Sequence, residues 1–123
     1  MAYCPDRSVR WTTYLGDVMR GSKELDIYLS TAHYVRDIRK HRSDQAITLG
    51  YKNYAEYSME TKMAGSVENV QTMISTLKPE AKRGQETELE DLQNFAESRG
   101  FEEELEEYDI DFFRRKKRRV LLG

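Results

Sequence analysis

Cysteine, proline and long apolar runs are scarce in this sequence of 123 residues. Cys4 is the only cysteine, so no internal disulfide can form and nothing points to an oxidising compartment. No run of about eighteen apolar residues exists, and residues 1–10 lack the apolar stretch of a secretory signal. We therefore expect no membrane span and an intracellular, cytoplasmic location, with a mitochondrial or nuclear one left open.

Signals for β-strands are missing as well. The sequence contains no alternating apolar pattern, no Asn-Gly hairpin signal and no long internal repeat. Hydrophobic residues make up 38% and charged residues 34%, a polar balance that still permits folding. A chain of this length buries one modest core, so we expect one domain or sub-domain.

Apolar residues at three-to-four spacing predict an all-α array of about four to six helices. Pro79 lacks a backbone donor and crowds the preceding turn, so we expect a kink or a break there. Four tyrosines on apolar stripes should pack in the core: Tyr14, Tyr28, Tyr54 and Tyr57. The predicted helices cover residues 6–20, 22–49, 54–64, 66–99 and 108–113.

Charge is distributed unevenly behind a net charge of −2. Residues 1–50 hold eight Lys/Arg against six Asp/Glu, residues 51–113 hold six against sixteen, and residues 114–119 are all basic. We therefore divide the chain into a helical region, residues 1–113, and a basic C-terminal tail, residues 114–123. The possible basic patch consists of Arg114, Arg115, Lys116, Lys117, Arg118 and Arg119.

This basic run is compatible with a nuclear-localisation signal, with a phosphate-binding tail, or with a merely solvated tail. No aromatic stacking platform, zinc finger or recognition-helix pattern accompanies it, so nucleic acid is disfavoured as a partner. The acidic residues 102–107, with Asp109 and Asp111, lack the oxygen-ligand spacing and glycine turn of a calcium loop. A solvated acidic run, in part neutralised by the basic run, is the favoured interpretation.

The residues that usually carry catalysis are few. His33 and His41 are the only histidines, and on one helix they would lie roughly 80° and 12 Å apart, too far to share a metal ion. Cys4 lies near Arg7 and Arg10, which can activate a thiol, but no base partner accompanies it. The sequence therefore predicts no catalytic residue, no metal ligand and no cofactor in this chain.

Two stretches of the sequence resemble a known family of zinc peptidases. Residues 1–14 (MAYCPDRSVRWTTY) combine a Tyr-Cys pair with spaced arginines and a tyrosine. Residues 49–64 (LGYKNYAEYSMETKMA) combine a Leu-Gly-aromatic turn, an Asn-Tyr-Ala helix start and a Lys-Met-Ala helix end. In this order the motifs are similar to those of the thimet oligopeptidase and oligopeptidase A family.

The resemblance continues over most of the chain. Residues 66–96 are similar to a long helix of the family that ends in Leu-x-x-Phe-Ala. Residues 105–113 are similar to an aromatic-rich stretch of the family, whose aromatic positions are occupied here by Tyr108, Phe112 and Phe113. Residues 30–39 match poorly, and the basic run departs from the family pattern. The resemblance implies a sub-region of the helical zinc oligopeptidase fold, a large peptidase that cleaves short peptides in a deep channel.

The family cleaves peptides with an H-E-x-x-H helix, in which two histidines bind zinc and the glutamate activates water. That motif is absent from this sequence. We therefore expect a truncated member, placed before the metal-binding helix, that does not cleave peptides alone and that self-associates through exposed apolar helix faces. The alternative is a helical interaction module whose basic end directs it to the nucleus or to nucleic acid.

Overall fold

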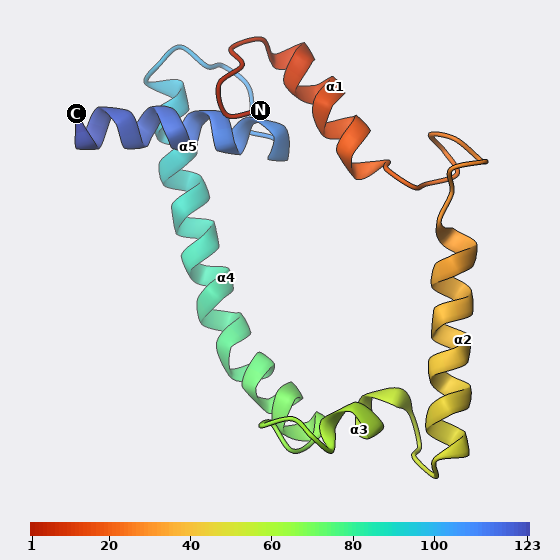
Figure 1. Cartoon of the computed structure of the whole chain (residues 1–123). Helices are drawn as coiled ribbons and strands as arrows, with labels where there is room; N and C mark the ends of the chain where they lie inside the picture. The colour runs from red at the N-terminus through yellow and green to blue at the C-terminus, as the bar shows by residue number, and fades with distance from the viewer. The chain divides into compact units, whose positions relative to one another are not determined.

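The structure, a computed structural model, describes residues 1–123 and consists of α-helices without any strand. This confirms the all-α array expected from the sequence. None of the helices combines the length and the apolar character needed to cross a membrane. The elements are α1 (Arg7–Val18), α2 (Ala32–Thr48), α3 (Tyr54–Met59), α4 (Val67–Glu97) and α5 (Glu107–Leu122) (Figure 1).

The chain divides into two compact units, which are described separately. Unit 1 combines Met1–Arg20 with Lys82–Gly123, and unit 2 is Gly21–Ala81. Unit 1 therefore holds α1, the C-terminal part of α4 and α5. Unit 2 holds α2, α3 and the N-terminal part of α4.

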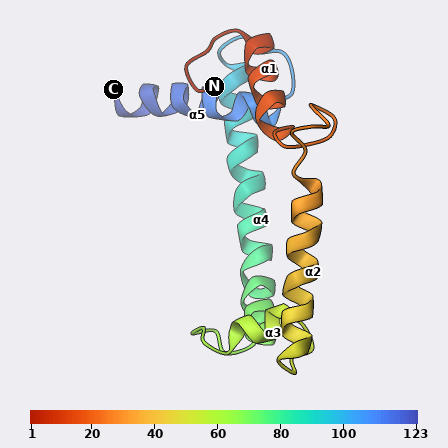
Figure 2. The same ribbon diagram turned by 45° about the vertical axis from the view of Figure 1, so that its right-hand side comes forward.

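Unit 1 contains the hydrophobic core of the molecule. Leu92 and Ala96, one turn apart on α4, are buried against Phe112 and Phe113 of α5, which crosses this end of α4 (Figure 2). Burial of each large side chain contributes roughly 1.5–3 kcal/mol. Half-buried side chains complete the cluster: Phe95, Phe101, Leu105 and Ile110.

The end of α4 folds the chain back onto this core. Gly100 adopts a φ of 82°, which favours glycine, and its N–H donates to the Glu97 carbonyl at 2.9 Å. The Phe101 N–H donates to the Ala96 carbonyl at 3.1 Å, and the Phe101 ring lies 4.9 Å from that of Phe113. The helix stop predicted near residues 99 and 100 is thus a turn that adds an aromatic side chain to the core.

Helix α5 is longer than the sequence predicted. The expected helix ended at Phe113, but α5 continues to Leu122 and carries the whole basic run. Lysine and arginine are good helix formers, and Arg119 in the last turn complements the partial negative charge of that helix end. The predicted boundary between residues 113 and 114 therefore falls inside a helix.

Helix α4 runs through Pro79 without a break. The break that the sequence allowed at this position is therefore not found. Pro79 removes one backbone hydrogen bond, which leaves the Ser75 carbonyl without its helical partner. Residues 71–80 are all exposed, so water can satisfy that carbonyl.

In unit 2, α2 begins at Ala32, ten residues later than the predicted start at residue 22. The Thr31 N–H instead donates to the Gly21 carbonyl at 2.8 Å and closes a loop in front of the helix. The prediction that Tyr28 lies in the core is wrong, because its side chain is 94% exposed in this loop. An apolar stripe along the sequence becomes a buried face only where another element covers it.

Helix α3 is shorter than predicted and ends at Met59. The Asn53 side chain caps it by accepting from the Glu56 N–H at 3.0 Å. Tyr54 and Tyr57 are half-buried, with ring centroids 5.7 Å apart, so they pack in part as predicted. Tyr51 adds a third ring 5.2 Å from that of Tyr57.

Candidate functional site

A buried ion pair joins the two ends of unit 1. The Arg10 side chain of α1 is 2% exposed, and that of Asp109 in α5 is fully buried. Two guanidinium nitrogens of Arg10, Nη2 and Nε, lie 2.6 and 3.2 Å from Oδ1 of Asp109. The pair links residues 99 positions apart in the sequence, so it fixes α1 against α5.

The remaining hydrogen-bonding capacity of Arg10 is also used. Its Nη1 donates to the carbonyl oxygens of Cys4 at 2.9 Å and Pro5 at 3.0 Å. The guanidinium carbon lies 4.5 Å from the centroid of the Phe112 ring, a cation–π arrangement. A buried charge is tolerated only when it is paired and hydrogen-bonded, and Arg10 meets both conditions.

Arg7 supplies a second cation to the same carboxylate. Its Nε and Nη2 lie 3.1 and 3.0 Å from Oδ2 of Asp109, and Nη1 pairs with Glu103. The guanidinium carbon lies 5.2 Å from the centroid of the Phe101 ring and 5.3 Å from that of the Tyr108 ring. Burial lowers the pKa of Arg7, but the hydrogen bonds that its guanidinium donates to Asp109 and Glu103 outweigh burial and leave the pKa raised.

Asp109 also begins its own helix. Its Oδ2 accepts from the backbone N–H of Glu106 at 3.3 Å, the reciprocal half of a capping box. One carboxylate thus accepts from Arg7, Arg10 and a helix cap at once. We call Arg7, Arg10 and Asp109 the arginine–aspartate centre.

An aromatic cluster lies beside this centre. The Trp11 ring is 6.1 Å from Tyr14 and 5.3 Å from Tyr108, and Tyr14 is 5.9 Å from Tyr108. The Tyr14 hydroxyl donates to Glu107 at 2.6 Å, and this hydrogen bond raises the pKa of Tyr14. The cluster is a second set of contacts between α1 and α5.

The interpretation of residues 102–111 as a solvated acidic run is wrong in part. Glu103 and Asp109 pair with arginines of α1, and Glu107 accepts from Tyr14. Only Asp111 contacts the basic run, through Arg114 at 3.7 Å. Three of these acids therefore hold α1, and one contacts the basic run.

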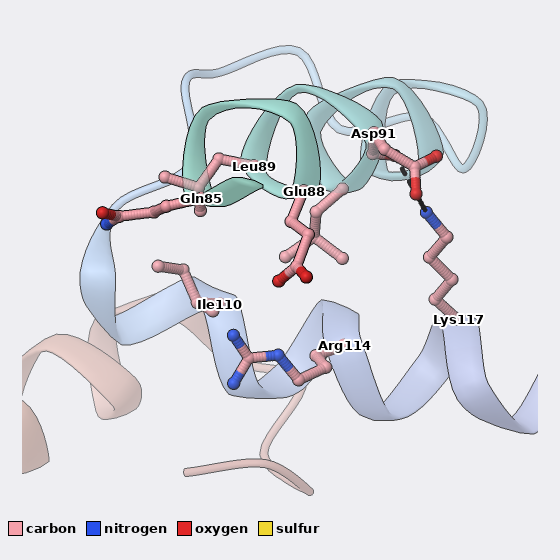
Figure 3. A pocket seen from close by; sticks show the side chains of 8 residues that line it. Gln85, Glu88, Leu89, Asp91, Ile110, Arg114 and Lys117 are labelled. Atoms are coloured by element: carbon pink, nitrogen blue, oxygen red, sulfur yellow. Dashed lines mark hydrogen bonds and ion pairs between the residues drawn. The ribbon is translucent and has the colours of Figure 1, made fainter. Parts of the chain in front are cut away.

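The structure divides the basic run by helix face. Arg114 and Lys117 face α4 across a hollow of about 280 Å³, where Lys117 pairs with Asp91 and Glu88 points towards Arg114 (Figure 3). Arg118 borders a second hollow with Tyr3, and Arg114 and Arg115 also line that hollow. A third group lines a separate hollow beside the end of α4: Arg115, Lys116 and Arg119.

The two histidines and the cysteine belong to different units of the chain. His33 and His41 are exposed on α2 in unit 2, and the thiol of Cys4 in unit 1 donates to the Asp6 carbonyl at 3.7 Å. No group of three His, Cys, Asp or Glu side chains is arranged to hold a metal ion. The residues present therefore do not fit the zinc ion that the family resemblance implies.

The sequence did not single out Arg7, Arg10 and Asp109 as a centre. A usable signal was present, because two arginines three residues apart share one face of the predicted first helix. Asp109 also interrupts a stretch of aromatic and apolar residues, where a charged side chain requires a partner. The sequence contains many acidic residues, and the turn at residues 98–106 determines which of them pairs with these arginines.

Comparisons with known proteins place the chain in a family. The model of peptidase family M3 matches residues 1–122, so the chain belongs to peptidase family M3. A probable cytosolic oligopeptidase A of Arabidopsis thaliana is 35% identical over 116 residues, 92% of this chain and 16% of that protein. Oligopeptidase A of Haemophilus influenzae is 29% identical over 123 residues, 98% of this chain and 18% of that protein.

A third relative is the chloroplastic and mitochondrial organellar oligopeptidase A of Arabidopsis thaliana, 35% identical over 101 residues. Here the match covers 81% of this chain and 12% of that protein. The chain thus spans less than a fifth of the length of these curated relatives. No solved structure gives a significant match. The resemblance to the oligopeptidase A family seen in the sequence is confirmed.

Proposed function

We propose that the chain is a structural segment of a zinc-dependent oligopeptidase and that it does not cleave peptides by itself. The match to peptidase family M3 along residues 1–122 supports the first part. The second part is supported by one observation, the absence of an H-E-x-x-H motif from the sequence. His33 and His41, eight residues apart, do not replace two histidines one turn apart.

The arginine–aspartate centre defines the contribution of unit 1 in this proposal. It holds α1 and α5 in one arrangement through charges that are desolvated and geometrically matched. Such a centre adds conformational specificity rather than a reactive group, because every polar atom of Asp109 and Arg10 is already engaged. We propose that the segment positions helices for a catalytic part that binds the zinc ion.

The same proposal covers the substrates and the location of the complete enzyme. Peptides would be the substrates of the complete enzyme, and the cytoplasm its location, as in the relative named a cytosolic oligopeptidase A. Exposed apolar side chains in unit 2 would pack on other parts of that enzyme or, in the isolated chain, on a second copy. They include Tyr34, Val35, Ile38, Met73, Ile74 and Leu77.

A chimera tests the proposal. This chain replaces the aligned segment of Haemophilus influenzae oligopeptidase A, and cleavage of a quenched fluorescent peptide is measured for the chimera, for the relative without the segment and for the chain alone. We expect activity only in the chimera, and we expect a chimera with Asp109→Asn to lose it together with its thermal stability. Chelator-sensitive cleavage by the chain alone would contradict the proposal.

A further inference from the structure

A cationic hollow of about 550 Å³ lies in unit 1, beside the C-terminal end of α4 and the second half of α5. Four of its six lining side chains are positively charged and none is acidic. The apolar remainder comes from one residue on each helix. The lining consists of Phe95, Arg99, Arg115, Lys116, Arg119 and Val120.

Helical spacing explains why these cations gather. Arg115 and Lys116 are consecutive and Arg119 follows one turn later, so the three share one face of α5, whereas Arg114 and Lys117 face α4. Arg114 and Lys117 form ion pairs with acids, but no carboxylate pairs with Arg115, Lys116 or Arg119.

Arg115 is held in place without losing its charge. Its Nε donates to the Ala2 carbonyl at 2.7 Å, and its guanidinium carbon lies 4.4 Å from the centroid of the Tyr3 ring. Both terminal nitrogens are left to donate to another acceptor, because only Nε is hydrogen-bonded within the chain. An arginine fixed in this way loses less conformational entropy when it binds an anion.

Two further cations rest on aromatic rings. The Lys116 ammonium lies 4.5 Å from the centroid of Phe112, and the Arg99 guanidinium lies 5.4 Å from that of Phe95. A ring neither neutralises a cation nor occupies its N–H donors in the plane of the group. Arg119 makes no hydrogen bond or ion pair within the chain.

Charge decides what the hollow attracts. The C-terminal ends of α4 and α5 each place about half a negative charge nearby, which together offset about one of the four positive charges. The remaining excess is clearly positive. A small hollow with several full positive charges and free N–H donors favours an anion with a high charge density.

We infer that this cationic hollow binds a small phosphate anion carrying several charges, of the oligophosphate class. A phosphate group brings three strong acceptor oxygens and up to about two negative charges, and it matches the fork of an arginine side chain. Carboxylates carry one charge each, so neutralising the same four cations requires a longer acidic segment. The inference does not depend on the proposed role in peptide hydrolysis.

Calorimetric titration with tripolyphosphate tests this inference on the full chain. Arg119→Gln removes a cation that lines the hollow. Arg118→Gln is the matched control, because it removes another exposed charge one residue earlier, outside the hollow. We expect one saturable site, weakened about tenfold or more by Arg119→Gln and less than about twofold by Arg118→Gln. Arg99→Gln should reproduce the effect from the α4 side.

Three results would overturn the inference. Equal weakening in Arg119→Gln and Arg118→Gln would show diffuse attraction to the whole basic run. Tighter binding of a hexaglutamate peptide than of tripolyphosphate would assign the hollow to acidic peptides. If the unsubstituted chain shows no saturable binding of tripolyphosphate up to about 10 mM, the chain has no such site. Far-UV circular dichroism confirms that each variant is folded.

Discussion

The arginine–aspartate centre should contribute strongly to the stability of unit 1. Asp109→Asn keeps the shape of the side chain but removes its charge, so it leaves Arg10, which is 2% exposed, as an uncompensated buried cation. Breaking one partner of such a pair typically costs about 3–5 kcal/mol. Because a folded domain is stable by only about 5–15 kcal/mol, this loss should bring unit 1 close to unfolding at room temperature.

Trp11 provides the assay. It is the only tryptophan, and its ring lies 5.3 Å from that of Tyr108 within unit 1. Its fluorescence in a urea titration therefore follows the contact between α1 and α5 and not the unfolding of unit 2. We expect the urea midpoint of Asp109→Asn to fall sharply at an unchanged slope.

Asp111→Asn is the control. It lies on the same helix and removes the same charge, but its partner Arg114 is 3.7 Å away and both side chains are largely exposed, so the expected loss is roughly 0–1 kcal/mol. A double substitution, Arg10→Met with Asp109→Leu, should recover much of the stability, because it removes both buried charges together. Equal losses for Asp109→Asn and Asp111→Asn would refute the reasoning.

Three further predictions concern titration and helix α4. The hydrogen bond from the Ser8 hydroxyl lowers the pKa of Asp6 below 3.8. The ionised Asp6 carboxylate therefore stabilises the fold above that pH, and this stabilisation is lost as pH falls through the lowered pKa. Asp6→Ala should make the melting temperature depend less on pH in the acid range. The hydrogen bond to Glu107 raises the pKa of Tyr14 above 10.0. The neutral Tyr14 hydroxyl therefore stabilises the fold fully below that pH, and this stabilisation is lost as pH rises through the raised pKa. Tyr14→Phe should remove this alkaline decrease in melting temperature, and an unchanged dependence on pH would contradict the role given to this hydrogen bond. Pro79→Ala restores a helical hydrogen bond at an exposed site and should stabilise α4 by up to about 3 kcal/mol, seen as greater ellipticity at 222 nm and a higher melting temperature; a loss of ellipticity would argue against a continuous α4.

The sequence predicted the helices better than their surroundings. Periodicity and capping residues located α1, the start of α3 and the end of α4 within a few residues, because these signals are local. The segment before Ala32 was wrong, since an apolar stripe becomes a helix face only where another element covers it, and Tyr28 is left exposed. The length of α5 was underestimated, because a basic run on its own resembles a tail.

The candidate site was predictable only in part. The absence of an H-E-x-x-H motif could be determined from the sequence alone. The pairing of Arg10 with Asp109 could not, because it joins residues 99 positions apart and depends on the turn at Gly100. Likewise, only the positions of Asp91 and Asp111 reveal which members of the basic run are paired and which line the cationic hollow.

The proposed function requires that this member of peptidase family M3 does not itself hold the zinc ion used in peptide cleavage. The most direct test is the amount of zinc that the purified chain retains after dialysis against buffer with a weak chelator, measured by atomic emission. We predict far less than one zinc ion per chain. One tightly retained zinc ion per chain would contradict the account.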